Sequence, residues 1–294
     1  MGSANIKDIK RRIKSVESTM QITKAMELVA SSKLRRAKDR ASASKPYFDA
    51  LYKAVAVVRR DALSGKKDVS QKHALVIAVA GDRGLAGGFN HNVLKLAEKN
   101  ISSLSEKGFA ASVLPIGKKA QEHFKPSEFT LYETVDFSPE NVTAQECMEV
   151  AEGILKKYFR GEFSEVYICY TTFVNTLSQV ETAIKVLPLS DDQQEAENDK
   201  TFDGKKYPAS VIYDPDPETV LNTLLPKYFA GILYGAIVES YAAEQAARRT
   251  AMESATDNAQ EMIDTLSLEF NRARQALVTK ELTEIVSGSM MREE

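Results

Sequence analysis

The stretch ALVIAVAGDRGLAGGFN (74–90) joins an apolar run of seven residues to a turn that contains four glycines. A short apolar run bounded by turn residues is typical of a buried strand, and the sequence that follows Asn90 is typical of a helix. A glycine-rich turn between a strand and a helix is also a place where proteins bind phosphate. The stretch therefore raises two hypotheses, a phosphate cradle and a tight turn in which glycine relieves steric strain.

The residue types of this turn favour the second hypothesis. A Walker-type cradle needs GxxxxGK followed by Ser or Thr, whereas Gly88 is followed by FNH. A dinucleotide site needs GxGxxG and an acidic residue near the end of the second strand. Here the glycines are spaced by three, three and one, and Glu98 and Glu106 fall in or at the end of the intervening helix. We therefore expect no cofactor at this turn.

Strands and helices alternate along the sequence on both sides of the turn. The expected strands are 74–80, 110–116, a weaker 128–133, 164–173 and 180–187, and the expected helices are 91–107, 117–125 and 140–160. This alternation predicts βαβ units and a mostly parallel sheet, while FVNTLSQ (173–179) predicts a hairpin that adds an antiparallel edge strand. Residues 190–206 are polar, charged and aperiodic, which predicts a mobile surface loop.

The N-terminal region has a helical pattern instead. From Asn5 to Ser44 there is no Gly or Pro, and apolar residues recur at alternating spacings of three and four, as in a coiled-coil seam. The expected seam comprises Ile6, Ile9, Ile13, Val16 and Met20, and then, after a change of phase, Ile22, Met26, Val29 or Ala30, Leu34, Ala37 and Ala41. Pro46 predicts a kink or break, after which residues 47–63 resume the apolar pattern.

The C-terminal region mirrors this pattern. After the turn cluster DPDPE (214–218), helix-like sequence continues to about Val286, interrupted only in its first third. A helix of roughly 70 residues would be about 105 Å long, more than a globular domain of this size can contain. Its middle, 242–259, is rich in Ala, which allows close approach of a partner helix. The seam is then expected to continue through Met262, Leu266, Phe270, Ala273 and Leu277.

The two ends carry opposite charge, although the whole chain of 294 residues has a formal net charge of only −2. Residues 1–60 have 15 basic and 5 acidic side chains, a net of +10, and residues 215–294 have 7 and 13, a net of −6. Antiparallel pairing of the ends brings these charges together. The predicted fold class is α/β, with a long antiparallel coiled coil made by 1–63 and 215–294 and a central Rossmann-like domain at 70–214.

Composition excludes several other classes of protein. No run of 18 apolar residues exists, and the N-terminus lacks the apolar core of a signal peptide, so we expect a cytoplasmic chain without membrane insertion. Cys147 and Cys169 have no CxxC spacing, the three histidines form no HExxH, and there is no GxSxG. We expect neither a metal nor a catalytic site. The basic N-terminal helix is better explained by a solvated face opposite a partner helix than by nucleic-acid or membrane binding.

Five segments, in the same order along the chain, resemble the gamma subunit of the F-type ATP synthase. They are IKDIKRRIKSVESTMQITKAMELVASSKLRRA (6–37), GDRGLAGGFN (81–90), FVNTLSQ (173–179), ESYAAEQAARRTAMESATDNA (239–259) and FNRARQALVTKELTEIVSGS (270–289). VTKELTEIVSGS departs mildly at both ends from the family's ITxELxEIVSGA pattern. The chain resembles the bacterial type, because it lacks the cysteine-bearing insertion of the chloroplast form.

The resemblance implies a rotor shaft without an active site of its own. In the family, the terminal helices form a coiled coil inside a hexamer of three alpha and three beta subunits. The α/β domain sits beside the epsilon subunit and the membrane rotor ring of c subunits. Proton- or sodium-driven rotation of the ring is thereby coupled to ATP synthesis or hydrolysis. The implied location is the cytoplasmic face of the bacterial cell membrane, as a peripheral protein.

The family's contact residues fall on three places of this sequence. Contacts to the lower lobes of beta are implied at Lys24, Met26 and Glu27. A catch on the upper parts of beta and alpha is implied at Arg248, Arg274, Gln275, Thr279 and Glu281. Contact with the polar loops of the ring is implied at Tyr213 and Asp214. Two other interpretations stay open at this point: a dinucleotide-binding enzyme with helical arms, and a coiled-coil adaptor without a rotary role.

Overall fold

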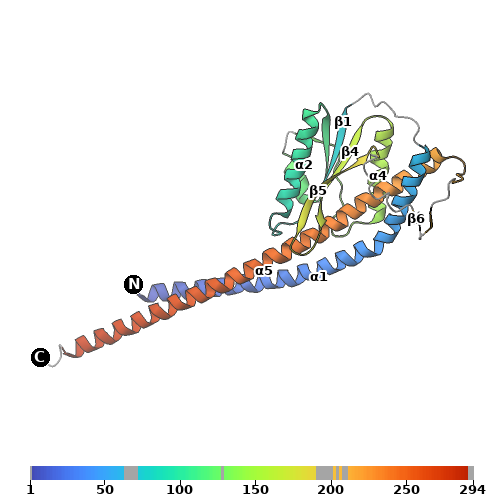
Figure 1. Ribbon diagram of the computed structural model, residues 1–294. Coiled ribbons are helices and arrows are strands. Elements are labelled where there is room, and N and C mark those ends of the chain that lie inside the picture. The colour runs from blue at the N-terminus through green and yellow to red at the C-terminus, as the bar shows by residue number, and fades with distance from the viewer. Residues whose placement is uncertain are drawn as a thin grey trace. The chain divides into compact units, whose positions relative to one another are not determined.

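The structure is a computed structural model that describes residues 2–62, 72–126, 129–189, 201–202, 205–206 and 211–290 (Figure 1). The chain divides into two compact units. Unit 1 consists of residues 1–31 and 248–294, and unit 2 consists of residues 32–247. The two long helices, α1 (Gly2–Ala62) and α5 (Pro217–Met290), each contribute residues to both units.

Unit 2 is built on a five-stranded sheet with the order β3-β2-β1-β4-β5. The strands are β1 (His73–Val79), β2 (Ala110–Ile116), β3 (Thr130–Leu131), β4 (Glu165–Phe173) and β5 (Gln179–Leu187). β1 pairs in parallel with β2 and β4, and β2 pairs in parallel with β3. β4 and β5 form an antiparallel hairpin, so β5 is an edge strand. The predicted mostly parallel sheet with one antiparallel edge strand is therefore confirmed.

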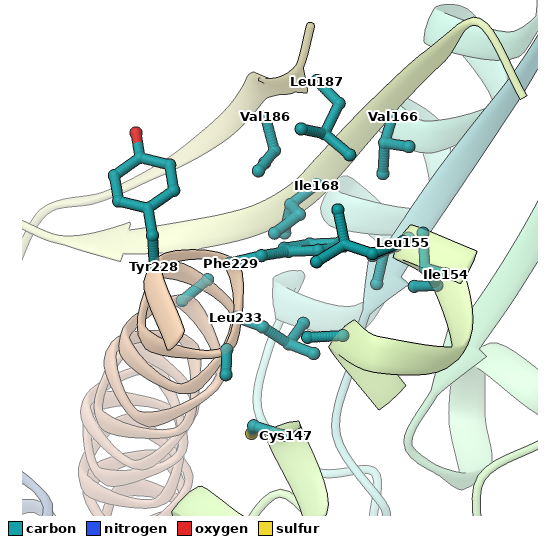
Figure 2. Packing of buried hydrophobic residues seen from close by; sticks show 14 of the residues in the cluster. Cys147, Ile154, Leu155, Val166, Ile168, Val186, Leu187, Tyr228, Phe229 and Leu233 are labelled. Atoms are coloured by element: carbon teal, nitrogen blue, oxygen red, sulfur yellow. The ribbon is translucent and has the colours of Figure 1, made fainter. Parts of the chain in front are cut away.

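Apolar side chains cover both faces of this sheet. Leu75, Ile77 and Val79 of β1 belong to a cluster with α4 (Ala144–Phe159) and with the parts of α1 and α5 in unit 2. The alternate residues of β1 belong to a second cluster with α2 (Phe89–Glu106) and α3 (Lys118–Phe124). Figure 2 shows Phe229 and Leu233 of α5 packed between α4 and β4. Because β1 is buried on both faces, it carries a continuous apolar run rather than an alternating one.

Of the predicted kink or break at Pro46, the break is wrong, because α1 continues through it to Ala62. Pro46 is exposed, and Leu51, Val55 and Val58 beyond it are buried in the first cluster. A proline inside a helix costs about 3 kcal/mol, and the burial of three large side chains at roughly 1.5–3 kcal/mol each outweighs that cost. α5 likewise continues through Pro226. Residues 190–200 lie outside the described residues, and 201–202 and 205–206 form the short antiparallel pair β6 and β7 rather than part of a loop.

In unit 1, α1 and α5 run antiparallel (Figure 1). Their register is defined by the hydroxyl groups of Thr23 and Thr256, whose oxygens are 2.8 Å apart. Ile9 lies 14 residues before Thr23 and Phe270 lies 14 residues after Thr256, so they occupy the same level of the pair. Ile9 is buried and Phe270 is half-buried. The predicted antiparallel coiled coil is confirmed.

Two predicted seam positions in unit 1, Ile22 and Met262, need correction, and the structure decides between the two alternatives at a third. The seam passes through Thr23, which is 9% exposed, while Ile22 is 60% exposed. Of the alternatives at the next position, Ala30 is buried and Val29 is exposed. On α5, Met262 is 53% exposed and its neighbour Ile263 is half-buried. The spacing of three and four therefore continues without the expected change of phase at Ile22, because a threonine that satisfies its hydroxyl across the pair takes the seam position.

By length and composition, one helix among the described residues is apolar enough to cross a membrane. It is the stretch Pro217–Val286 of α5, and half of its most apolar window is buried inside the protein. The core helix of a soluble protein meets the same criterion. The absence of an unbroken run of 18 apolar residues did not predict this window, because residues such as Gly231, Gly235 and Glu239 interrupt the apolar sequence of α5.

Candidate functional site: the glycine-rich turn and the helix surfaces

Hydrogen bonds of the Asn90 side chain hold the glycine-rich turn after β1 in shape. The Gly81 N–H donates to Asn90 Oδ1 at 2.9 Å, and Asn90 Nδ2 donates to the carbonyl oxygen of Arg83 at 3.0 Å. Leu85 and Gly87 have φ of 62° and 56°, the left-handed region in which glycine is favoured. The side chain of Leu85 is exposed, which leaves it room in this conformation. The turn therefore directs the chain from β1 into α2 using its own hydrogen bonds.

The acidic residue of the turn also occupies the start of α3. The backbone N–H of Lys118 donates to Asp82 Oδ1 at 3.0 Å, and the hydroxyl of Ser138 donates to Asp82 Oδ2. Gly81 accepts a further hydrogen bond at its carbonyl oxygen from the N–H of Lys119, at 3.0 Å. Negative charge at a helix N-terminus is favourable, and here the protein supplies it itself. Within the described ranges no group of three metal-ligating side chains exists.

The first predicted contact site, on α1, forms a compact polar pair. Lys24 Nζ donates to Glu27 Oε2 at 2.9 Å, and this hydrogen bond raises the pKa of Lys24 above its usual value. Glu253 and Asp257 of α5 act in the same direction through their charge, as expected from the opposite charges of the two ends. Met26 is half-buried on the same turn of helix.

The residues predicted for the catch lie on α5 and fall into two environments. Arg248 is buried, with 9% of its surface exposed, whereas Arg274, Gln275, Thr279 and Glu281 are exposed. In the register set by Thr23 and Thr256, Gly2 of α1 is level with residue 277. Residues 278–286 therefore lie past the first described residue of α1, and their large apolar side chains are exposed: Val278, Leu282, Ile285 and Val286.

The third predicted site precedes α5. Tyr213 is half-buried against the first apolar cluster, and Asp214 is exposed. Asp216 then caps the helix, because its Oδ1 accepts the N–H of Thr219 at 2.9 Å and its Oδ2 accepts the Thr219 hydroxyl at 2.7 Å. The predicted residues thus lie on separate surfaces, and each surface is a candidate for contact with a partner.

Two sets of residues were missed by reasoning from sequence. Ile22, Leu28 and Val29 form an exposed apolar surface beside Lys24, and the seam assignment had hidden two of them. Arg40 donates to the carbonyl oxygens of Glu140 at 2.8 Å and Val142 at 2.6 Å, while Lys33 pairs with the Glu140 carboxylate at 2.6 Å. These bonds connect residues about a hundred positions apart, and no local sequence pattern signals them.

Taken together, these features define a class of α/β protein whose terminal helices pair as a coiled coil and expose apolar side chains. A model of the family described as ATP synthase matches residues 5–290. The chain is 48% identical to the ATP synthase gamma chain of Ruminococcus albus over 291 residues, 98% of each protein. It is 40% identical to the sodium ion specific ATP synthase gamma chain of Acetobacterium woodii, over 97% of this chain and 98% of that protein.

A solved structure agrees with this fold. A chain of the Euglena gracilis mitochondrial ATP synthase superposes with a TM-score of 0.66 at 18% identity, over 98% of this chain and 94% of that one. The chain belongs to the gamma-chain family of the ATP synthases. A gamma chain is the central rotor shaft of that enzyme and does not carry its catalytic sites.

Proposed function

We propose that the chain couples rotation of a membrane ring of c subunits to ATP synthesis and hydrolysis in a hexamer of three alpha and three beta subunits. The observation that carries this proposal is the surface of unit 1, where α1 and α5 expose apolar side chains on several sides of a thin helix pair. Exposed apolar surface of this extent marks an interaction site. The interpretations as an enzyme with helical arms or as an adaptor offer no reason for it to surround the pair.

An antiparallel pair of two different sequences has no symmetry of its own. Ile22, Leu28 and Val29 are exposed on α1, whereas Met262 and Leu268 are exposed on α5. Each of three identical beta subunits around the pair therefore faces a different surface. Differential contacts stabilise a different conformation of each subunit, and turning the pair exchanges these conformations.

We assign each of the three predicted groups of contact residues to a different partner surface. Lys24, Met26 and Glu27 contact the lower lobes of beta, where the adaptable Met side chain tolerates changing partners. Arg248, Arg274, Gln275, Thr279 and Glu281 form the catch, since a guanidinium binds a carboxylate through two parallel hydrogen bonds. Tyr213 and Asp214 contact the ring. In this proposal 1–63 and 215–294 act together as the shaft, and 70–214 binds epsilon beside the ring.

The complex to which a gamma chain belongs is membrane-associated. We place this chain on the cytoplasmic face of a bacterial cell membrane, held there peripherally through the ring. The relative from Acetobacterium woodii is described as sodium ion specific. Either protons or sodium ions are compatible with the shaft, because it transmits rotation and does not bind the ion.

Reconstitution tests the proposal and its alternatives. The full chain is mixed with alpha and beta subunits, and ATP hydrolysis and stoichiometry are measured. A hydrolytically active complex of three alpha, three beta and one copy of this chain is the expected result. The purified chain alone is expected neither to bind nor to hydrolyse ATP. Turnover by the chain alone would support an enzyme instead, and assembly without ATP-driven rotation would support an adaptor.

A further inference from the structure

Glu244 of α5 lies directly against the glycine-rich turn. Its side chain belongs to unit 2 and is only 4% exposed. A Cβ atom added to Gly81 would lie 2.7 Å from Glu244 Cδ and Oε1 and 2.9 Å from Oε2. Contacts this short do not occur between real atoms of these kinds. A side chain at residue 81 would therefore force the end of the buried Glu244 side chain to move aside.

The backbone of Gly81, against which the Glu244 carboxylate packs, is fixed by hydrogen bonds on both sides of the residue. The N–H of Gly81 is bound by Asn90 and its carbonyl oxygen by the N–H of Lys119. Gly117 packs from the other side, since a Cβ there would lie 2.1 Å from the carbonyl oxygen of Ala80. The turn and α5 also share an apolar contact of Ala86, Phe89 and Ala243. The seat of the carboxylate is thus rigid and enclosed.

α5 makes two further polar contacts at the neighbouring strand. The N–H of Phe173, at the end of β4, donates to Glu239 Oε1 at 3.2 Å, and the N–H of Thr171 donates to Ser240 Oγ at 3.5 Å. β1 and β4 are adjacent parallel strands, and these contacts lie at their carboxyl ends. In open α/β sheets, that edge is where ligands bind. Here the helix α5 occupies it.

We propose that the glycine-rich turn is a packing seat for the end of the Glu244 side chain of the chain's own shaft helix. The seat prevents α5 from sliding or turning on the α/β domain, so that torque applied to the domain reaches the coiled coil. Glu244 is a positioning residue in this mechanism. The inference rests on the proposed rotary function and adds to it the joint through which rotation passes.

Two glycine variants test the seat. Gly81→Ala displaces the carboxylate, whereas Gly84→Ala is the matched control, since nothing lies within 4 Å of a Cβ at residue 84 and its φ is ordinary. Each variant is assembled into the complete membrane-bound complex, and ion pumping per ATP hydrolysed is measured. We expect Gly81→Ala to lower this ratio by about threefold, the size of a typical coupling between contacting residues, and Gly84→Ala to leave it unchanged.

Glu244 variants separate positioning from folding. Glu244→Asp withdraws the carboxylate by one methylene, so the double variant with Gly81→Ala is expected to regain most of the lost pumping. Glu244→Gln keeps the shape and is expected to keep pumping, whereas Glu244→Ala empties the seat and is expected to lower pumping while the ATPase rate is kept. Unchanged pumping in Glu244→Ala, or no recovery in the double variant, would overturn the inference. Failure of the unaltered chain to assemble would instead overturn the rotary proposal.

Discussion

The two units bury their apolar side chains to very different degrees. In unit 2, three layers enclose two clusters, and residues such as Ile77, Ile168 and Phe229 are fully buried. In unit 1, the two helices contact each other along a single narrow seam, and most residues of the seam are only half-buried. Unit 2 therefore holds most of the chain's own stability. Unit 1 keeps apolar surface available for partners, as a shaft surrounded by alpha and beta subunits requires.

The largest expected effect tests where that stability lies. Phe229→Ala removes a fully buried ring from the unit 2 core and is expected to lower the free energy of unfolding by about 3–5 kcal/mol. Leu268→Ala in unit 1, where the side chain is 61% exposed, is the matched control and is expected to change it by less than about 0.5 kcal/mol. Denaturant unfolding of the purified chain measures both. Similar losses in the two variants would contradict the comparison.

The second prediction concerns the surface that unit 1 offers to partners. Arg274→Ala with Gln275→Ala is expected to reduce coupled ATP synthesis in the assembled complex by about tenfold, since the proposed catch would lose two polar contacts to the alpha and beta subunits. Arg272→Ala, also at an exposed position of α5, serves as the control. Deletion of the residues after Ser287 is expected to be tolerated better than the double substitution. Equal synthesis in the truncated and doubly substituted complexes would count against the catch assignment.

A smaller effect is expected at the polar contact between Thr23 and Thr256 in the unit 1 seam. Thr23→Val removes the hydrogen bond between the two hydroxyls, while the Thr256 hydroxyl still donates to the carbonyl oxygen of Met252, so the expected cost is at most about 1 kcal/mol in unfolding free energy. Changing both residues to Val restores a matched apolar pair and is expected to return stability close to the original value. Thermal unfolding of the single and double variants checks this. A double variant as unstable as the sum of its parts would show that the hydroxyls do not act as a pair.

The smallest effect is a pH dependence in unit 2. The hydrogen bond from Lys33 lowers the pKa of Glu140 below its usual value of 4.5. The contribution of the Lys33–Glu140 pair to folding stability is therefore complete above about pH 4.5. It is lost as the pH falls through the lower pKa that Glu140 has in the folded chain. Because both side chains are partly exposed, it amounts to less than about 1 kcal/mol. The difference in melting temperature between the unaltered chain and Lys33→Gln should shrink on acidification, and a difference independent of pH would rule out the pair.

The sequence predicts the elements of this molecule better than their contacts. The strand 110–116 and the hairpin at FVNTLSQ follow from local apolar pattern and turn residues, and both are confirmed. The break at Pro46 was wrongly predicted because the cost of proline is local, whereas Leu51, Val55 and Val58 are buried against parts of the chain that are distant in sequence. Ile22 and Met262 were misjudged because a neighbour with a more favourable angular position takes the seam. The seat of Glu244 joins residues 163 positions apart, and only the folded chain shows it.

Direct observation of rotation tests the central claim. Cys147 and Cys169 are both buried, so Ser103→Cys on the exposed side of α2 provides an accessible thiol for a bead or fluorophore. The complex with alpha and beta subunits is fixed to a surface through beta, and ATP is added. We predict that the probe turns in one direction with three pauses per revolution, one for each beta subunit. ATP hydrolysis with a stationary probe would contradict the account of this chain as a rotor shaft.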